Sequence, residues 1–176
     1  MCNQLTGKIE GRRQLLLAVI GGLSICFLFH VYGVSVWEAS MGHSLFTWLY
    51  GMWSNESTEA VDYSHGLVIP FVSAWLLWRK RSALMVAWQE NQSHGFGMVL
   101  LAGALCVHAA GLRMQIPHMS ALAFVVAMWS ICWSFAGRRF AVIAGFPLLF
   151  LVFAIPIGFL AHATFPLRLL GAVVST

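Results

Sequence analysis

Residues 62–81 read DYSHGLVIPFVSAWLLWRKR. This stretch opens with a short polar motif, continues as an apolar segment and closes with three successive basic residues, Arg79, Lys80 and Arg81. As a helix, its uncharged part, Tyr63–Trp78, would be about 24 Å long, slightly shorter than a hydrocarbon core of about 30 Å. The pattern predicts a membrane helix with the polar motif at one surface and the basic cluster at the other.

The composition of the whole chain agrees with a membrane protein. Of its 176 residues, 60% are hydrophobic and 9% are charged, whereas soluble domains carry about 25% charged residues. A water-soluble globule of this size could not bury so much apolar surface. The formal net charge of +4 comes from short basic clusters at predicted helix ends, without a basic stripe or a nucleic-acid-binding motif. We therefore expect no nucleic-acid partner.

Spanning segments recur along the chain. They lack the alternation of barrel strands, so helices are the expected spanning element. Five stretches are long and apolar enough: Gln14–Trp37, Tyr63–Trp78, Phe96–Leu112, His118–Gly137 and Phe140–Ala161. The end of the chain, Phe165–Thr176, looks like the first turns of a further helix. The predicted fold is an all-α, polytopic integral membrane helix bundle with five spans and the start of a sixth, in which residues 1–13 form a tail and residues 14–176 one transmembrane domain.

The basic residues predict the orientation. On an alternating path, all three clusters fall on one side of the membrane, which the positive-inside rule makes cytoplasmic; they are Lys8, Arg12 and Arg13, then Arg79, Lys80 and Arg81, then Arg138 and Arg139. The N-terminus is then cytoplasmic and the loop 38–62 lies outside. Within this loop, the aromatic segment His43–Trp53 is predicted either to lie flat in the outer interface or to pack as a loop.

The histidines are also unequally distributed between the two predicted sides of the membrane. Six of the seven fall on the predicted outer side: His30, His43, His65, His108, His118 and His162. Ionisable groups at membrane depth normally line cavities, so an outward-facing polar cavity with His65 as its best candidate is one interpretation. Interfacial histidines without a shared task are the other.

The motif Tyr63-Ser64-His65-Gly66, with the apolar run and WLLWRKR that follow it, resembles the N-terminal half of the exosortase/archaeosortase family. Members are multi-pass membrane proteins thought to act as cysteine transpeptidases on C-terminal sorting signals. Segments 137–139, 146–150 and 153–157 also resemble the family pattern, although Gly158 stands where a second proline is expected. The resemblance, which runs from Asp62 to the chain end, implies supporting roles near the reaction site for Asp62, Tyr63, Ser64, His65, Gly66 and Pro70, and structural roles for Gly137, Arg138, Pro147 and Pro156.

The resemblance stops short of the family's nucleophile. The proposed catalytic cysteine of the family lies further downstream, in a Cys-Ser-Gly type motif followed by an arginine and a histidine. The four cysteines of this chain (Cys2, Cys26, Cys106 and Cys132) lack that context. We therefore assign no catalytic residue, metal or cofactor to this chain, and expect it to be an inactive portion truncated at its C-terminal end. A non-catalytic multi-pass membrane protein, acting as a scaffold or transporter-like subunit, is the alternative.

The resemblance also implies partners and a location. The partners would be exported proteins with a C-terminal transmembrane sorting signal, together with the lipid bilayer, and the location would be the cell (inner) membrane. Small residues allow membrane helices to approach closely, so a substrate's own transmembrane tail could pack at Gly21, Gly22, Gly103 or Gly111. Prolines inside spans free carbonyl groups and can kink helices. Pro70, Pro147 and Pro156 are therefore interpreted either as kinks that widen the outer half of the bundle or as prolines that the spans simply tolerate.

Two other functional classes are disfavoured. His94 and His108 stand at a spacing typical of ligands to two stacked haems, but no second predicted span carries a matching pair. A metal or proton transporter is disfavoured because the methionines are dispersed and no acidic residue lies inside a predicted span.

Overall fold

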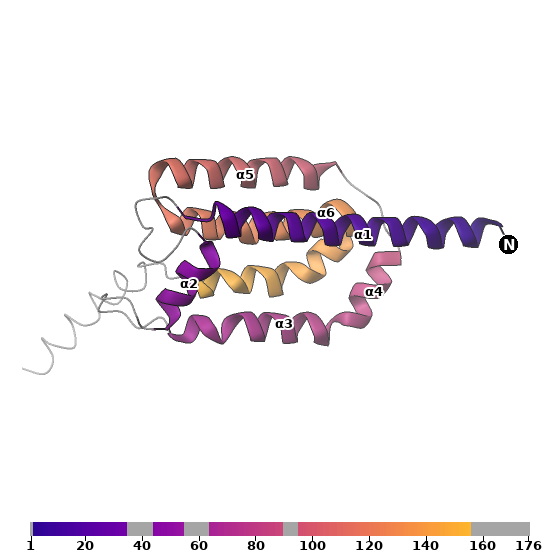
Figure 1. Cartoon of the computed structure of the whole chain (residues 1–176). Helices are drawn as coiled ribbons and strands as arrows, with labels where there is room; N and C mark the ends of the chain where they lie inside the picture. The colour runs from indigo at the N-terminus through magenta and orange to yellow at the C-terminus, as the bar shows by residue number, and fades with distance from the viewer. Residues whose placement is uncertain (1, 35–43, 55–63, 90–94, 156–176) are drawn as a thin grey trace, which may run out of the picture.

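The computed structural model describes residues 2–34, 44–54, 64–89 and 95–155 (Figure 1). Within these ranges the chain forms α-helices and short 3₁₀ turns and no strand, which confirms the all-helical fold class. In chain order the elements are α1 (Cys2–Val31), α2 (Leu45–Trp53), η2 (Ser64–Leu67), α3 (Ile69–Arg79), α4 (Arg81–Gln89), α5 (Phe96–Met114), α6 (Pro117–Phe150) and η3 (Leu151–Ala154).

Three stretches of the described chain are long and apolar enough to cross a membrane: Gly11–Val31, Phe96–Met114 and Pro117–Ala154. The first two correspond to predicted spans. The predicted span Tyr63–Trp78 is instead the short turn η2 followed by α3, whose 11 residues extend about 16 Å. The membrane-protein class is therefore supported, whereas the predicted count of five spans is not confirmed, and the predicted sixth helix lies outside the described residues.

Helix α6 folds back on itself at Gly137. Straight, the 38 residues of Pro117–Ala154 would extend about 57 Å, nearly twice the thickness of a hydrocarbon core. Gly137 instead has φ 83° and ψ 174°, a backbone conformation that is essentially restricted to glycine. The indole N–H of Trp129 donates to the Ala141 carbonyl at 2.8 Å, although these residues would be about 18 Å apart on a straight helix. The predicted spans His118–Gly137 and Phe140–Ala161 are thus two arms of one hairpin, 117–136 and 138–150, the described part ending at Ile155.

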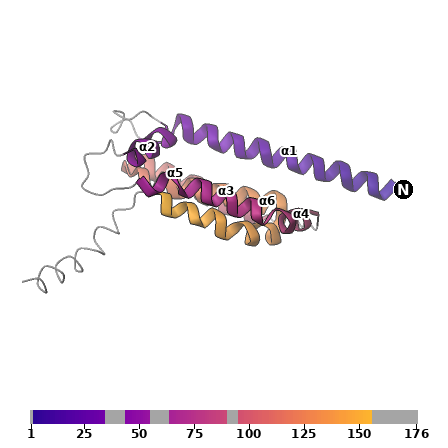
Figure 2. The same ribbon diagram turned by 90° about the horizontal axis from the view of Figure 1, so that it is seen from below.

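The two arms of α6 form the centre of the bundle. α5 packs along α6, and α1, α3 and α4 also contact it; seen from below, α1 lies on one side of the layer that contains α3, α5 and α6 (Figure 2). α5 approaches α6 closely because its buried positions include Gly97, Ala104 and Gly111. A Cβ atom at Gly111 would meet Met119 of α6 at 3.0 Å, so this glycine serves contacts inside the bundle.

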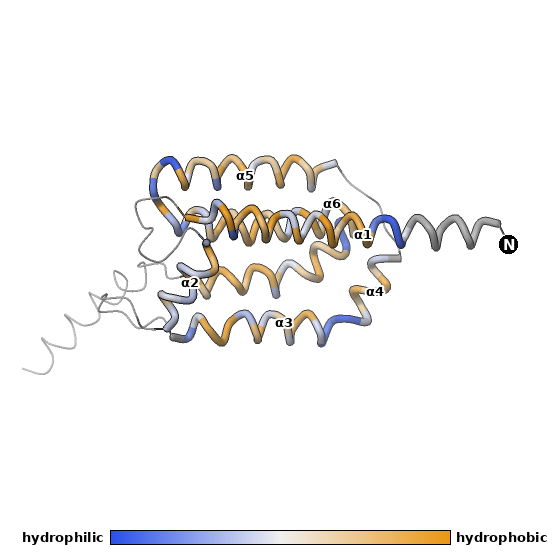
Figure 3. Tube along the Cα trace, viewed as in Figure 1, coloured by the Kyte–Doolittle hydropathy of each residue, from blue (hydrophilic) through white to orange (hydrophobic). Residues whose placement is uncertain are grey.

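Basic residues gather at one end of the bundle. Figure 3 shows hydrophilic segments at the α3–α4 junction, at the reversal of α6 and on the neighbouring part of α1. These segments carry seven of the eight basic side chains that the structure describes: Arg12, Arg13, Arg79, Lys80, Arg81, Arg138 and Arg139. Arg113, in the last turn of α5, lies at the opposite end. The clusters therefore share one end of the molecule, as the alternating path predicted.

The prolines of the predicted spans lie in different settings. Pro70 lies in the first turn of α3, where its missing N–H has no helical partner to lose, so of the two interpretations the tolerated proline applies there. Pro147 lies inside α6 as expected. The Pro147 carbonyl accepts a hydrogen bond from the Ser73 hydroxyl at 2.7 Å. The Leu151 N–H, which would bond this carbonyl in a regular helix, is directed instead to the carbonyls of Leu148 and Leu149. This bond joins α3 to the second arm of α6. Pro156 lies outside the described residues.

Candidate functional site

The end opposite the basic clusters is closed by α2. Leu45 and Trp48 are fully buried, with 0% and 2% of their surface exposed, whereas Tyr50 is 59% exposed. The Trp48 ring packs edge-on against His118 of α6 with 5.3 Å between ring centroids. α2 therefore packs into the end of the bundle, and the described part of segment His43–Trp53 (44–53) is a packed helix and not a packed loop.

One side chain of α2 holds two distant turns together. The Trp53 indole N–H donates to the Ala154 carbonyl of η3 at 2.8 Å. The same ring covers Gly66 of η2, where an added Cβ would overlap the indole nitrogen. Gly66 is buried and Ala154 is 6% exposed. The turns η2 and η3, which belong to the two segments singled out by the family resemblance, are thus fixed against each other through Trp53.

The structure places the predicted site residues in two groups. Ser64, His65 and Gly66 lie in η2, and Pro70 lies in the first turn of α3, the helix that follows. His65 has an exposed side chain, and its carbonyl accepts the Val68 N–H at 3.1 Å. Gly137 and the exposed Arg138 lie at the other end, and Pro147 is buried in the second arm of α6. Asp62, Tyr63 and Pro156 are outside the described residues.

The histidines at this end have separate partners. His30 shares a hydrogen bond with Ser44 at 2.9 Å. His108 is 4% exposed, shares a hydrogen bond with Ser120 at 3.2 Å and stacks on Phe29 with ring centroids 4.0 Å apart. In the described part of the chain no group of three or more His, Cys, Asp or Glu side chains is arranged to hold a metal ion. His108 therefore packs between helices, whereas His30 is exposed near the end of α1 and pairs with the residue that precedes α2, and His65 is the exposed histidine of η2.

The cysteines lie in the long helices. Cys26, Cys106 and Cys132 are free thiols in α1, α5 and α6. Apolar residues flank each of them directly in the sequence, so the adjacent positions supply no base or cation of the kind that activates a thiolate. The side chains of η2 and these thiols belong to different elements.

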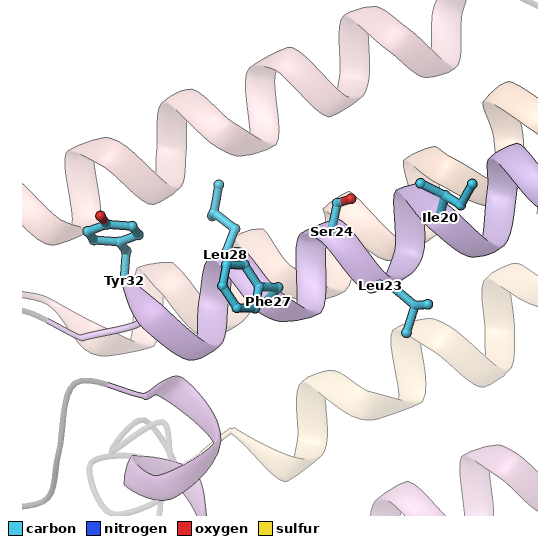
Figure 4. A pocket seen from close by; sticks show the side chains of 6 residues that line it. All are labelled: Ile20, Leu23, Ser24, Phe27, Leu28 and Tyr32. Carbon is cyan, nitrogen blue, oxygen red and sulfur yellow. The ribbon is translucent and has the colours of Figure 1, made fainter.

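A separate hollow of about 530 Å³ runs along α1 (Figure 4). One helix supplies its lining, which is largely apolar and consists of Ile20, Leu23, Ser24, Phe27, Leu28 and Tyr32. Its polar groups are two hydroxyls, and an open apolar surface of this kind on a membrane helix is suited to lipid chains. We therefore place the candidate site at η2 and not in this groove.

Trp53 is the site residue that sequence reasoning missed. In the sequence it is simply the last residue of an aromatic segment, and local patterning carries no signal for a contact with Gly66 and Ala154. The only sequence signal was Gly66, which follows His65, since a ring that packs closely against the backbone requires a residue without a side chain at that position.

Fold and site together define an integral membrane protein built from apolar helices. Residues 53–176 match the family described as Transmembrane exosortase (Exosortase_EpsH). The match covers more than half of the chain, so the chain belongs to the transmembrane exosortase family. The matched region begins at Trp53, the residue that joins η2 to η3. No curated protein and no solved structure matches the chain.

Replacing Trp53 with phenylalanine tests the junction. Trp53→Phe keeps an aromatic ring over Gly66 but leaves the buried Ala154 carbonyl without its donor, which should cost about 1–3 kcal/mol of unfolding free energy. Trp133→Phe is the matched control, because the Trp133 indole N–H is buried without a hydrogen-bond partner. Equilibrium unfolding of both purified variants in the same detergent measures the difference. Equal stability of the two variants would show that the bond to Ala154 does not hold the turns.

Proposed function

We propose that this chain provides the membrane-embedded part of an exosortase-type system that processes exported proteins with a C-terminal transmembrane sorting signal. The family match over residues 53–176 is the observation that carries the proposal. The fixed position of the Ser64-His65-Gly66 turn at the end opposite the basic clusters supports it, because a peptide emerging from the membrane would meet that end.

The proposed orientation follows the positive-inside rule. The end with seven of the eight described basic side chains faces the cytoplasm, together with the N-terminus, and η2 faces outward. α1, α3, α5 and both arms of α6 then cross the cell (inner) membrane. Since α3 is shorter than a hydrocarbon core of about 30 Å, we propose that η2 lies within the outer half of the membrane.

At η2, His65 is proposed as a supporting group for peptide-bond chemistry. Cysteine transpeptidation requires a thiolate, a base or cation beside it, and donors for the developing oxyanion. The exposed imidazole of His65 can donate or accept a hydrogen bond at a substrate carbonyl or amide. Since Cys26, Cys106 and Cys132 stand in apolar segments, we propose that these 176 residues do not contain the nucleophile.

The substrate's own transmembrane tail is proposed to pack beside the bundle. Of the four small residues predicted for this contact, Gly21 and Gly111 have side chains of α6 within 4 Å of the position that an added Cβ would take. At Gly22 and Gly103 an added Cβ would have no neighbour within 4 Å. These two positions therefore remain open for the close approach of another helix.

Site-specific photo-crosslinking tests the proposal. A photoreactive residue replaces His65, and in a control it replaces the exposed Ser82 of α4 at the basic end. The probe is an exported reporter with a C-terminal apolar span, compared with the same reporter without that span. We expect a crosslink from position 65 only, only to the reporter with the span, and no cleavage of the reporter.

Two results would contradict the proposal in different ways. Cleavage of the reporter by this chain alone would show that it contains a nucleophile. Equal crosslinking to both reporters, or none from position 65, would show that the substrate does not bind specifically at η2. Either result would favour the non-catalytic scaffold.

A further inference from the structure

We propose that the basic end of the bundle binds the headgroup phosphate of an anionic phospholipid at the α3–α4 junction. The site consists of Arg79, Lys80 and Arg81. It lies at the opposite end from η2 and does not depend on the proposed function.

Aromatic rings position all three junction cations. The Arg79 guanidinium lies 5.5 Å from the Trp75 ring centroid and the Arg81 guanidinium 4.7 Å from the Trp78 ring centroid. The Lys80 ammonium lies 5.9 Å from the ring of Phe146 in α6. Cation–π attraction of this kind holds a charge in place without neutralising it. The three positive groups thus lie over aromatic rings at the α3–α4 junction and keep their charge.

The α3–α4 junction lies where an apolar span gives way to a surface helix. α4 is nine residues long, and Figure 1 shows it turning away from the direction of α3 towards the reversal of α6. Its Trp88 packs against Phe140 with 5.8 Å between ring centroids. Phe140 directly follows Arg138 and Arg139 in the sequence. Met85 and Val86 of α4 are exposed. A short helix with exposed apolar side chains beside a basic cluster is suited to the membrane interface.

The local charge favours the binding of an external anion, because the side chains that the structure describes include no acidic group to pair with the cations. None of the side chains that the structure describes, those of residues 11–34, 44–54, 65–88 and 95–155, is acidic. Within this part of the molecule the junction cations therefore have no carboxylate to neutralise them. Guanidinium groups present paired donors that match phosphate oxygens.

The surrounding surface selects a lipid and not a free phosphate ion. Trp75 and Trp78 are 55% and 66% exposed, and they flank the cations on the side of the apolar span. A lipid would place its phosphate between the cations and the upper part of its acyl chains against these rings. Clusters of basic residues directly beside a membrane span are typical of anionic-lipid recognition.

Native mass spectrometry of the purified full chain tests the site. The protein is exposed to mixtures of phosphatidylglycerol, which is anionic, and phosphatidylcholine, which is zwitterionic. Each basic residue at an anionic surface is worth roughly a fivefold change in binding. We therefore expect the unmodified chain to retain phosphatidylglycerol at least about fivefold over phosphatidylcholine, and the triple variant Arg79→Gln/Lys80→Gln/Arg81→Gln to lose this preference.

Controls separate the proposed site from general effects. Arg113→Gln, which removes the exposed cation at the opposite end, should keep the preference. Equal retention of both lipids by the unmodified chain, or an equal loss of preference in the Arg113 variant, would overturn the proposal; the first comparison needs no variant to fold. Displacement of phosphatidylglycerol by millimolar inorganic phosphate would show a free-anion site and overturn the choice of lipid, whereas its retention supports the lipid.

Discussion

Replacing Gly97 with alanine should destabilise the bundle strongly, while the same change at Gly103 in the same helix should not. A Cβ atom at position 97 would lie 2.5 Å from the Ser134 hydroxyl oxygen, 2.6 Å from its backbone nitrogen and 2.9 Å from its Cα. Two of these atoms belong to the backbone of α6, so rotation of a side chain cannot relieve the overlap. α5 would have to move away from α6, which we expect to cost at least about 1–3 kcal/mol.

Gly103 provides the matched control. A Cβ there would have nothing within 4 Å, and alanine favours a helix over glycine by up to about 1 kcal/mol. Equilibrium unfolding of the two variants in one detergent should therefore show opposite signs relative to the unmodified chain. If Gly97→Ala is as stable as Gly103→Ala, α5 and α6 are not packed backbone to backbone as described.

The second large effect is expected at the reversal of α6. Gly137→Ala introduces a Cβ at φ 83° and ψ 174°, a region that non-glycine residues occupy only with strain of about 1–3 kcal/mol. Relief of that strain would open the hairpin and break the bond between Trp129 and the Ala141 carbonyl. We expect a lower unfolding free energy and faster proteolysis between the two arms.

A neighbouring glycine controls for the added methyl group. Gly145 is also buried, in the second arm, but an added Cβ there would make ordinary contacts with the Trp129 ring at 3.5 Å and beyond. Gly145→Ala should therefore be tolerated. Equal destabilisation by both substitutions would attribute the effect to crowding, and the backbone conformation of Gly137 would not be its cause.

Much of the fold could be predicted from apolar runs and basic clusters. These locate α5 to within two residues, because a membrane span must be continuous and uncharged, whereas α1 begins twelve residues before the predicted span Gln14–Trp37 and ends six residues before its end. They overestimate α3, since hydropathy alone treats Tyr63–Trp78 as one helix. Pro70 could have indicated the boundary, because proline is accommodated in a first helical turn and its lack of an N–H disfavours a helix that continues through it.

The candidate site could be predicted only in part. The resemblance singled out His65 and Gly66 as candidate residues. The match of residues 53–176 supports the same family. The contact between Trp53, Gly66 and Ala154 joins segments far apart in the chain, and local patterns of hydropathy carry no information about such contacts. The role of Gly137 was named as structural, but its positive φ depends on the reversal of α6 and is not encoded by neighbouring residues.

The central claim is that η2 and α2 lie on the outer side of the membrane, opposite the basic end. Single-cysteine labelling tests it directly, in a background in which Cys2, Cys26, Cys106 and Cys132 are replaced by serine. Tyr50→Cys reports on α2 and Ser82→Cys on α4, since both side chains are exposed. A membrane-impermeant maleimide added to intact cells should label the Tyr50→Cys variant and should label the Ser82→Cys variant only after permeabilisation. Labelling of the Ser82→Cys variant alone, or of both variants equally in intact cells, would contradict the account.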